Sequence, residues 1–186
     1  GSYFYNYLRK NKNIIFAKTN TTPNILFVSA RSLKKKRKFS IPKKIWLKNY
    51  LSATKNKNVD IIIELIGGAE GPAKKLVFEA LKNRKHVVTA NKALVAKYGD
   101  QLSKIAEKNK VNFEFEAAVC GGVPIIRSLK EGLIANKISK IYGIFNGTSN
   151  YILSEMDKHK NSFDEVLSNA KKLGYAESNP SADLNG

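Results

Sequence analysis

The chain has 186 residues, 42% of them hydrophobic, and its 33 lysines and arginines against 15 acidic residues give a formal net charge of +18. This apolar fraction is sufficient for a globular core and excludes a disordered basic tail. One cysteine, Cys120, and two histidines exclude a disulfide framework and a Cys- or His-rich metal cluster. The single cysteine favours a reducing compartment, which we take to be the cytoplasm. The longest apolar runs are far shorter than the roughly 20 residues of a membrane-spanning helix, so we expect no membrane contact.

The excess of basic residues makes nucleic acid the first partner to consider, because a basic surface attracts phosphate. The densest basic cluster is Lys34-Lys35-Lys36-Arg37-Lys38. Most other lysines occur singly at helical spacing, and no helix-turn-helix, RNP or zinc motif accompanies them. We therefore interpret the charge mainly as surface composition and expect no nucleic-acid partner. A basic nucleic-acid-binding module is kept as an alternative.

The region from about residue 24 to 119 alternates short apolar runs with helical periods, which predicts βαβ units and a parallel sheet. Strands are predicted at 24–30 and 59–66. Pro72 suits the first turn of a helix. Apolar residues then follow at helical spacing, namely Ala73, Leu76, Val77, Ala80 and Leu81.

The predicted order continues with a strand at 86–89, a helix at 92–110 and a strand at 111–119. After residue 120 the pattern changes, and we predict a helix at 125–133, an alternating half-exposed strand at 138–145, and helices at 149–158 and 162–173. The fold class is therefore α/β, with an incomplete doubly wound parallel sheet in a first domain (1–120). The start of a second, α+β domain follows (121–186).

Polar residues follow the first two strong strands, where open parallel sheets bind ligands. Gly67 and Gly68 would let a ligand approach the backbone, although a plain tight turn explains two glycines better. Thr89, Asn91 and Lys92 meet at a helix start. A lysine beside the positive end of a helix is electrostatically misplaced, which favours a ligand-binding role over a solvated one.

A third loop places small residues around the acid Glu116. Its carboxylate and inward-turned backbone carbonyls would suit a hard cation, and a hinge between domains is the alternative. Two further candidates are the N-capped helix start at 146–150 and the helix end at 174–177, which carries the acid Glu177.

Five blocks, in order and without rearrangement from about residue 59 to the last residue, resemble homoserine dehydrogenase. They are Glu-Leu-Ile-Gly-Gly at 64–68, Val-Val-Thr-Ala-Asn-Lys-Ala-Leu at 87–94, Glu-Ala-Ala-Val at 116–119 with Gly-Gly-Val-Pro at 121–124, Gly-Ile-Phe-Asn-Gly-Thr-Ser-Asn-Tyr-Ile-Leu at 143–153, and Gly-Tyr-Ala-Glu at 174–177 with Asp-Leu-Asn-Gly at 183–186. Residues 1–58 match in general character only. The resemblance implies a Rossmann-type NAD(P)-binding domain and an α+β substrate domain that also forms a homodimer.

The resemblance implies reversible NAD(P)H-dependent reduction of L-aspartate 4-semialdehyde to L-homoserine, on the way to threonine and methionine. By position, Lys92 contacts substrate and nicotinamide, Glu177 holds the substrate amino group, and Asp183 lines the same pocket. The chemistry agrees, because an ammonium stabilises the negative charge that hydride addition builds on the aldehyde oxygen.

The cofactor residues implied by the resemblance are Ile66, Gly67 and Gly68, together with Lys92. The family's monovalent-cation site, for an ion such as sodium, matches Glu116, Val119, Gly121 and Val123.

The choice between NADP and NAD depends on the residues after the strand predicted at 24–30. No acid stands there for a ribose 2′-hydroxyl, whereas Arg31 and the cluster at 34–38 would pair with a 2′-phosphate. This favours NADP, with a basic surface loop as the alternative.

Two departures from the family pattern concern the ends of the sequence. The chain starts at Gly1, after the expected first strand and Gly-x-Gly-x-x-Gly turn, and stops at Gly186, before the expected helix with a catalytic Asp and Lys. We therefore expect part of a longer enzyme that is inactive, or nearly so, by itself; a catalytically silent or regulatory homologue is the other alternative. The sequence does not indicate whether an aspartate kinase or regulatory domain accompanies it.

Overall fold

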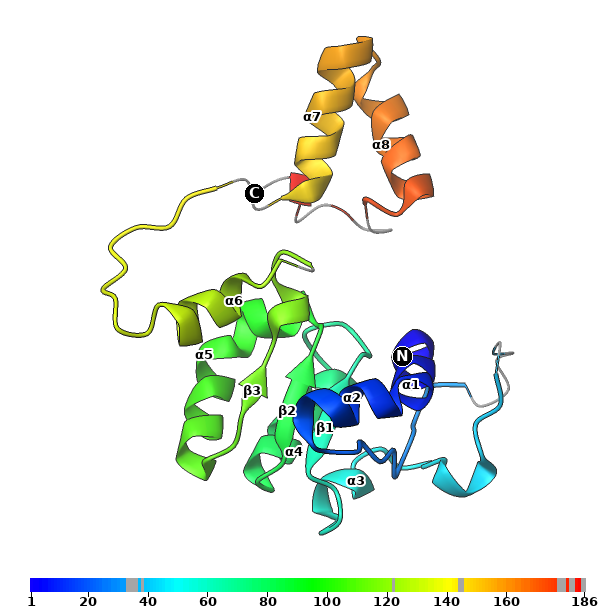
Figure 1. Ribbon diagram of the computed structural model, residues 1–186. Helices are drawn as coiled ribbons and strands as arrows, with labels where there is room; N and C mark the ends of the chain where they lie inside the picture. Colours follow the sequence, from blue (N-terminus) through cyan, green and yellow to red (C-terminus); the bar gives the residue numbers. More distant parts are fainter. Residues whose placement is uncertain are drawn as a thin grey trace. The chain divides into compact units, whose positions relative to one another are not determined.

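The computed structural model describes residues 1–32, 37, 39–121, 123–143, 146–176, 180 and 183–184. The chain divides into two compact units, Gly1–Leu133 and Ile134–Gly186, which are described separately below (Figure 1).

A parallel sheet forms the centre of the first unit. Among the described residues it contains three strands in the order β1 (Ile61–Glu64), β2 (His86–Thr89) and β3 (Phe113–Glu114). The register places Glu64 opposite Thr89 at the carboxyl ends of β1 and β2. The predicted α/β class with a parallel sheet is confirmed, and β2 has the predicted bounds.

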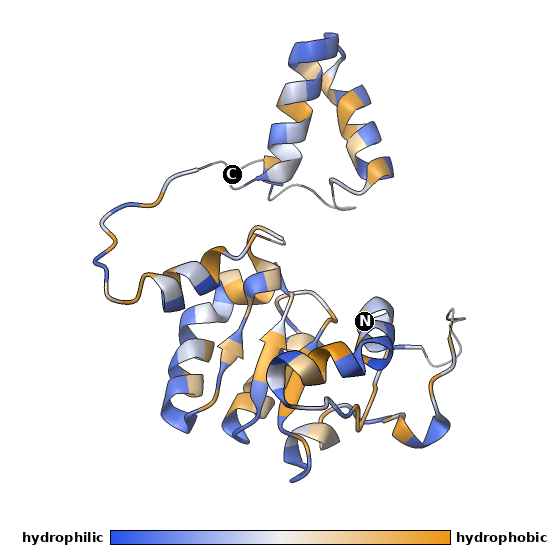
Figure 2. Ribbon diagram, in the orientation of Figure 1, coloured by the Kyte–Doolittle hydropathy of each residue, from blue (hydrophilic) through white to orange (hydrophobic). Residues whose placement is uncertain are grey.

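Two helices cover one face of this sheet. They are α4 (Pro72–Lys82), which contacts β1 and β2, and α5 (Lys92–Asn109), which packs on α4 and on β3. The predicted apolar face of α4 is buried in full, with Val77, Ala80 and Leu81 completely inaccessible to solvent. Figure 2 shows the same division, with apolar strands β1 and β2 beside helices that carry hydrophilic bands. The helical spacing of apolar residues therefore predicted the core correctly.

Side chains of β1 alternate between the two faces of the sheet, as the pleat requires. Ile62 and Glu64 are buried, whereas Ile61 is 54% exposed and Ile63 is 36% exposed. Glu64 thus points to the same face as the apolar core, although it is ionisable. The face that α4 and α5 cover therefore holds a carboxylate at the end of β1.

The strand predicted at 24–30 is not formed. Only Val28 makes a bridge, with Trp46, through hydrogen bonds from its N–H to the Ile45 carbonyl (2.8 Å) and from Leu47 N–H to its own carbonyl (2.9 Å). The pairing is limited to one residue because the bridge partner, Trp46, directly follows the short helix η1 (Lys43–Ile45). The apolar residues nevertheless pack on the core, as Leu26 and Phe27 do.

Other segments of the first unit also differ from prediction. The strand predicted at 111–119 is reduced to β3, because the backbone leaves the extended conformation at Phe115 and η2 (Glu116–Ala118) begins. Helices α1 (Ser2–Lys10), α2 (Lys12–Thr19) and α3 (Ser52–Lys55) were not predicted. The helix predicted at 125–133 is present as α6 (Ile125–Arg127) and the π-helical turn η3 (Ser128–Gly132).

The second unit is a helical hairpin of α7 (Gly147–His159) and α8 (Phe163–Leu173). Its small core consists of Ile152, Val166, Ala170 and Ala176. Both helices were predicted, and the polar N-cap expected at the start of α7 is present. Asn146 caps α7, and Ser162 caps α8 in a capping box.

The strand predicted at 138–145 is absent from its described part, 138–143. Ile141 is 55% exposed and Tyr142 is 85% exposed, so the alternating pattern buries nothing here. A half-buried strand needs a neighbouring strand to accept its hydrogen bonds. The described residues of this unit contain no such neighbour.

Candidate active site

The buried carboxylate of Glu64 connects the ends of β1 and β2. Glu64 is completely buried. Its Oε1 accepts hydrogen bonds from the backbone N–H groups of Ile66 (2.6 Å) and Gly67 (3.0 Å), and its Oε2 accepts one from the Thr89 hydroxyl. Three donors thus compensate for the loss of water around this acid. The loop after β1 is bound to the side chain of the strand's last residue.

Asn91 extends this connection to the start of α5. Its N–H donates to Thr89 Oγ1 (3.1 Å), and its side-chain Nδ2 donates to the Gly68 carbonyl (2.7 Å). Its Oδ1 accepts from Leu94 N–H (3.1 Å), which caps the helix. One side chain therefore fixes both the glycine loop and the first turn of α5. Lys92, the first residue of α5, is exposed beside this cap.

The loop after β1 has the backbone of a close-approach site. Gly67 and Gly68 have φ values of +86° and +80°, a left-handed conformation that favours glycine. A Cβ added at either position would meet no atom within 4 Å, so the space in front of them is open. The structure thus brings together the predicted cofactor residues Ile66, Gly67 and Gly68 in one loop. Asn91 ties that loop to the helix that begins at Lys92.

The basic residues predicted to select NADP are described only in part. Arg31 is exposed. Arg37 lies over the Trp46 ring, 4.9 Å from its centre, and donates to the Ser32 carbonyl (2.9 Å). Lys34, Lys35, Lys36 and Lys38 lie outside the described residues.

In the loop predicted to bind a monovalent cation, the carboxylate accepts two backbone hydrogen bonds. Glu116 Oε1 and Oε2 accept hydrogen bonds from the N–H groups of Ile126 (3.0 Å) and Arg127 (2.7 Å), so the acid holds the start of α6. The Val123 carbonyl accepts from Ile125 N–H (2.8 Å). Val119 and Gly121 lie in the same short segment. Within the described parts of the chain, no cluster of three or more His, Cys, Asp or Glu residues fits a metal ion.

In the second unit, the start of α7 holds Asp183. The Asp183 carbonyl accepts from Asn146 Nδ2 (2.6 Å) and Ser149 Oγ (2.7 Å). Thr148 is buried, and its hydroxyl donates to the Tyr175 carbonyl (2.7 Å) and lies 3.4 Å from Asp183 Oδ2. The motif block at 143–153 thus positions the predicted substrate residue Asp183. The predicted residue Glu177 lies outside the described residues.

A cluster around Glu70 was not predicted from the sequence. The Glu70 carboxylate accepts hydrogen bonds from Lys97 Nζ (2.7 Å), from the Tyr98 hydroxyl and from Lys74 Nζ (3.1 Å). These donors, Lys97 first, lower the pKa of Glu70 from 4.5 to about 2. The cluster connects α4 to α5 at the surface. The only sequence signal was the i,i+4 pair of Glu70 and Lys74.

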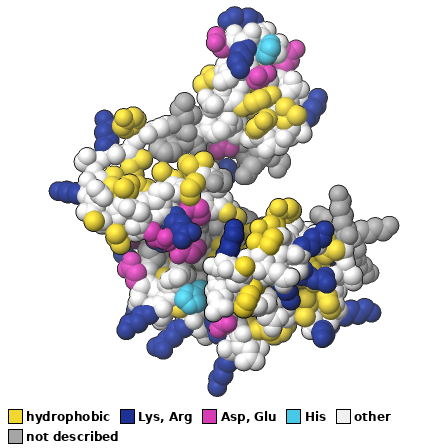
Figure 3. Space-filling view, in the orientation of Figure 1, with side chains coloured by type: hydrophobic (Ala, Val, Ile, Leu, Met, Phe, Trp, Pro, Cys, Tyr) yellow, Lys and Arg dark blue, Asp and Glu magenta, His cyan; other side chains and the backbone are white. Residues whose placement is uncertain are grey.

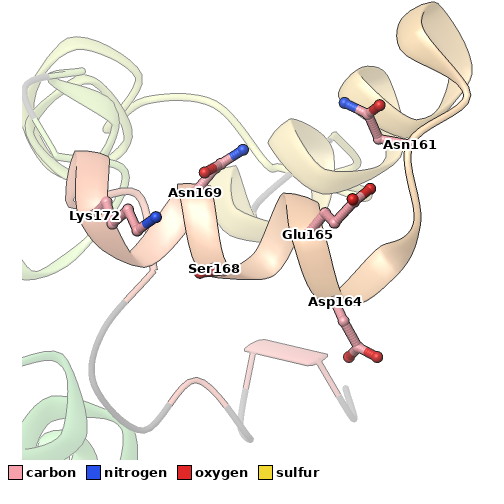
Figure 4. Close-up of a pocket in the computed structure, with 6 residues that line it drawn as sticks. All are labelled: Asn161, Asp164, Glu165, Ser168, Asn169 and Lys172. Atoms are coloured by element: carbon pink, nitrogen blue, oxygen red, sulfur yellow. The ribbon is translucent and has the colours of Figure 1, made fainter.

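A shallow surface pocket of about 580 Å³ lies on the second unit, along α8 (Figure 4). Its lining residues are Asn161, Asp164, Glu165, Ser168, Asn169 and Lys172. Glu165 already accepts from Ser162 N–H in the capping box, and Asp164 points away from Glu165 in Figure 4. None of these residues is a predicted site residue.

In the described parts of the chain, no helix is long and apolar enough to cross a membrane.

Two family models match most of the chain. The model described as "Homoserine dehydrogenase, NAD binding domain" matches residues 2–116, and the model described as "Homoserine dehydrogenase" matches residues 124–186.

Curated relatives and solved structures agree with these matches. The homoserine dehydrogenase of Neisseria gonorrhoeae is 50% identical over 145 residues, which are 78% of this chain and 33% of the relative. That of Bacillus subtilis is 44% identical over 159 residues, which are 86% and 36%. The crystal structure of a homoserine dehydrogenase from Thiobacillus denitrificans has a TM-score of 0.83 and 42% identity, and covers 97% of this chain and 41% of its own. The chain thus spans about a third of the length of these curated relatives.

Proposed function

Because the chain belongs to the homoserine dehydrogenase family, we propose that it supplies the nicotinamide-nucleotide site and part of the substrate site of that enzyme. The reaction is the reversible NAD(P)H-dependent reduction of L-aspartate 4-semialdehyde to L-homoserine, which serves threonine and methionine synthesis. The observation that carries this proposal is the hydrogen-bonded junction of β1, β2 and α5, which joins the open glycine loop to the helix that Lys92 begins.

Lys92 is the residue to which we assign the chemistry in this part of the chain. The bound nicotinamide would supply the hydride for the aldehyde carbon. As negative charge then grows on the aldehyde oxygen, the ammonium of Lys92 stabilises it and supplies a hydrogen-bond donor at that atom. We assign Glu177 to the substrate amino group and Asp183 to the same substrate pocket.

The residues present fit a dinucleotide at the glycine loop. Ile66, Gly67 and Gly68 present backbone at the carboxyl end of β1, with open space in front of both glycines. This is the place where open parallel sheets bind nucleotides. We favour NADP over NAD because Arg31 and the basic cluster at 34–38 follow the segment 24–30. A hyperthermophilic archaeal homoserine dehydrogenase solved in complex with NADPH is 30% identical to this chain, with a TM-score of 0.66.

Four further assignments complete the proposal. The backbone of Glu116, Val119, Gly121 and Val123 would bind a monovalent cation such as sodium, while the Glu116 carboxylate holds α6. A sodium dependence of turnover would support that site. We also propose that the whole enzyme forms a homodimer and that a domain boundary lies between residues 120 and 121. A cytoplasmic location is proposed as well, because the single exposed cysteine, Cys120, is suited to a reducing compartment.

A chimera tests the proposed function. The chain replaces the matching region of the Neisseria gonorrhoeae relative, and reduction of L-aspartate 4-semialdehyde is followed by the loss of NADPH absorbance. We expect turnover within about tenfold of the parent enzyme, because the replaced region is half identical in sequence. We expect no measurable turnover from the unfused chain, which spans about a third of that relative. A folded chimera that binds NADPH without turnover would refute the proposal.

A further inference from the structure

The carboxylate of Glu64 lies at the centre of a closed set of hydrogen bonds. On one side it binds the N–H groups of Ile66 and Gly67, and on the other it accepts from the Thr89 hydroxyl. Thr89 Oγ1 in turn accepts from Asn91 N–H (3.1 Å), and Asn91 Nδ2 returns to the Gly68 carbonyl (2.7 Å). The chain of contacts thus begins and ends in the same glycine loop. We call these three side chains, Glu64, Thr89 and Asn91, the carboxylate clamp.

Burial makes the clamp rigid. Glu64 is fully buried, Thr89 is 1% exposed and Asn91 is 6% exposed. Water therefore does not compete for these hydrogen bonds, and a broken contact would leave a buried polar group without a partner. The loop that the clamp holds contains two consecutive glycines, which have more conformational freedom to lose than any other residue type. Without the clamp, the backbone of this loop would sample many conformations.

We propose that Glu64, Thr89 and Asn91 are positioning residues that hold the glycine loop and the first turn of α5 in one fixed register. This inference rests on the proposed function, in which the loop receives the cofactor and Lys92 contacts the substrate. Neither Glu64 nor Thr89 needs to touch a ligand. Their role is to keep two ligand-binding elements at a constant separation, and misplacement by about 1 Å in an active site costs about 100-fold in rate.

We expect substitutions at Asn91 and at Thr89 to have different kinetic effects. Asn91→Asp keeps the Oδ1 that caps α5 at Leu94 N–H but loses the donor to the Gly68 carbonyl. It should loosen the glycine loop, so KM for NADPH should rise about tenfold while kcat changes little. Thr89→Val removes the hydroxyl that joins Glu64 to Asn91, so kcat should fall at least about tenfold because Lys92 loses its register.

A conservative variant and a variant remote from the clamp distinguish a loss of positioning from a general loss of stability. Thr89→Ser keeps the hydroxyl and should restore kcat. Glu64→Gln keeps an acceptor for the loop amides, and the Thr89 hydroxyl can accept from its amide, so kcat should fall less than in Thr89→Val. Thr54→Val removes another fully buried threonine hydroxyl, which donates to the carbonyl of Leu51, the N-cap of α3. It should lower stability and leave both kinetic constants unchanged.

The experiment measures these constants in the chimera and, in parallel, amide hydrogen exchange in the 186-residue chain. Slow exchange at Ile66 and Gly67 should be lost in Glu64→Ala and retained in Thr54→Val. Kinetic constants within twofold of the original in both Asn91→Asp and Thr89→Val, or unchanged exchange in Glu64→Ala, would overturn the inference. An inactive parent chimera whose exchange at these amides still depends on Glu64 would overturn the proposed function and leave the clamp itself supported.

Discussion

The hydroxyl of Thr89 satisfies two buried partners at once. It donates to Glu64 Oε2 and accepts from Asn91 N–H. Thr89→Val keeps the shape of the side chain and leaves both partners unsatisfied. We expect the free energy of unfolding to fall by about 2 to 4 kcal/mol, measured by urea denaturation. In Thr54→Val the hydroxyl lost donates to the Leu51 carbonyl, and the expected fall is about 1 kcal/mol. Equal losses in the two variants would contradict this account.

Glu70 should make stability depend on pH at low ionic strength. Its pKa is lowered from 4.5 to about 2 in the folded chain, chiefly by Lys97, so between these values the unfolded chain binds more protons. The stabilisation from Glu70 is therefore present above about pH 4.5 and is lost as the pH falls towards 2. We expect the difference in Tm between the wild type and Glu70→Gln to shrink over that range. Because the carboxylate is exposed, high salt should reduce the difference at neutral pH; a difference that is constant with pH would be the contrary result.

The positions of the candidate site residues could be read from the sequence, whereas the contacts among these residues could not. Strand ends and helix starts are local features, so Gly67, Gly68, Thr89, Asn91 and Lys92 were found by pattern. The Glu64 to Thr89 contact joins residues 25 positions apart and depends on strand register, which periodicity does not specify. An acid that ends an apolar strand, directly before two glycines, was the available signal.

The secondary-structure elements that were predicted correctly are also those whose signals are local in the sequence. Helices α4, α5, α7 and α8 were predicted from apolar spacing and caps, β1 from its dense β-branched residues, and β2 as a short strand between two helices. The strands predicted at 24–30 and, in its described part 138–143, at 138–145 are not formed. A strand is stable only beside a partner, and the sequence does not say which segment pairs with it. The N-terminal helices α1 and α2 were not predicted. In α2 the apolar residues Ile14 and Phe16 are exposed.

The capping box of α8 provides a test within the second unit. Ser162 Oγ accepts from Glu165 N–H, and the Glu165 side chain accepts from Ser162 N–H. Ser162→Ala should destabilise the helix by about 1 kcal/mol, seen as faster hydrogen exchange of the α8 amides. Ser168→Ala, an exposed change in the same helix, should leave that exchange unchanged or slower. Faster exchange in both variants would show that the box has no special role.

For the whole molecule, the motif blocks at 64–186 identified the family, and the family comparisons confirm the resemblance. The charge of +18 was less informative. On the face shown in Figure 3, Lys and Arg side chains are spread among hydrophobic and acidic ones. This distribution agrees with the interpretation of the charge as surface composition. That nucleic acid is not a partner stays a prediction.

In the proposed function, the junction of β1, β2 and α5 is an active site in which Lys92 acts on the substrate. The most direct measurement compares Lys92→Ala with Lys108→Ala in the chimera, because both lysines are exposed on α5 at opposite ends of the helix. We predict that Lys92→Ala lowers kcat by at least about 100-fold with the fold intact, and that Lys108→Ala stays within about twofold of the parent. A Lys92→Ala chimera as active as Lys108→Ala would contradict the claim.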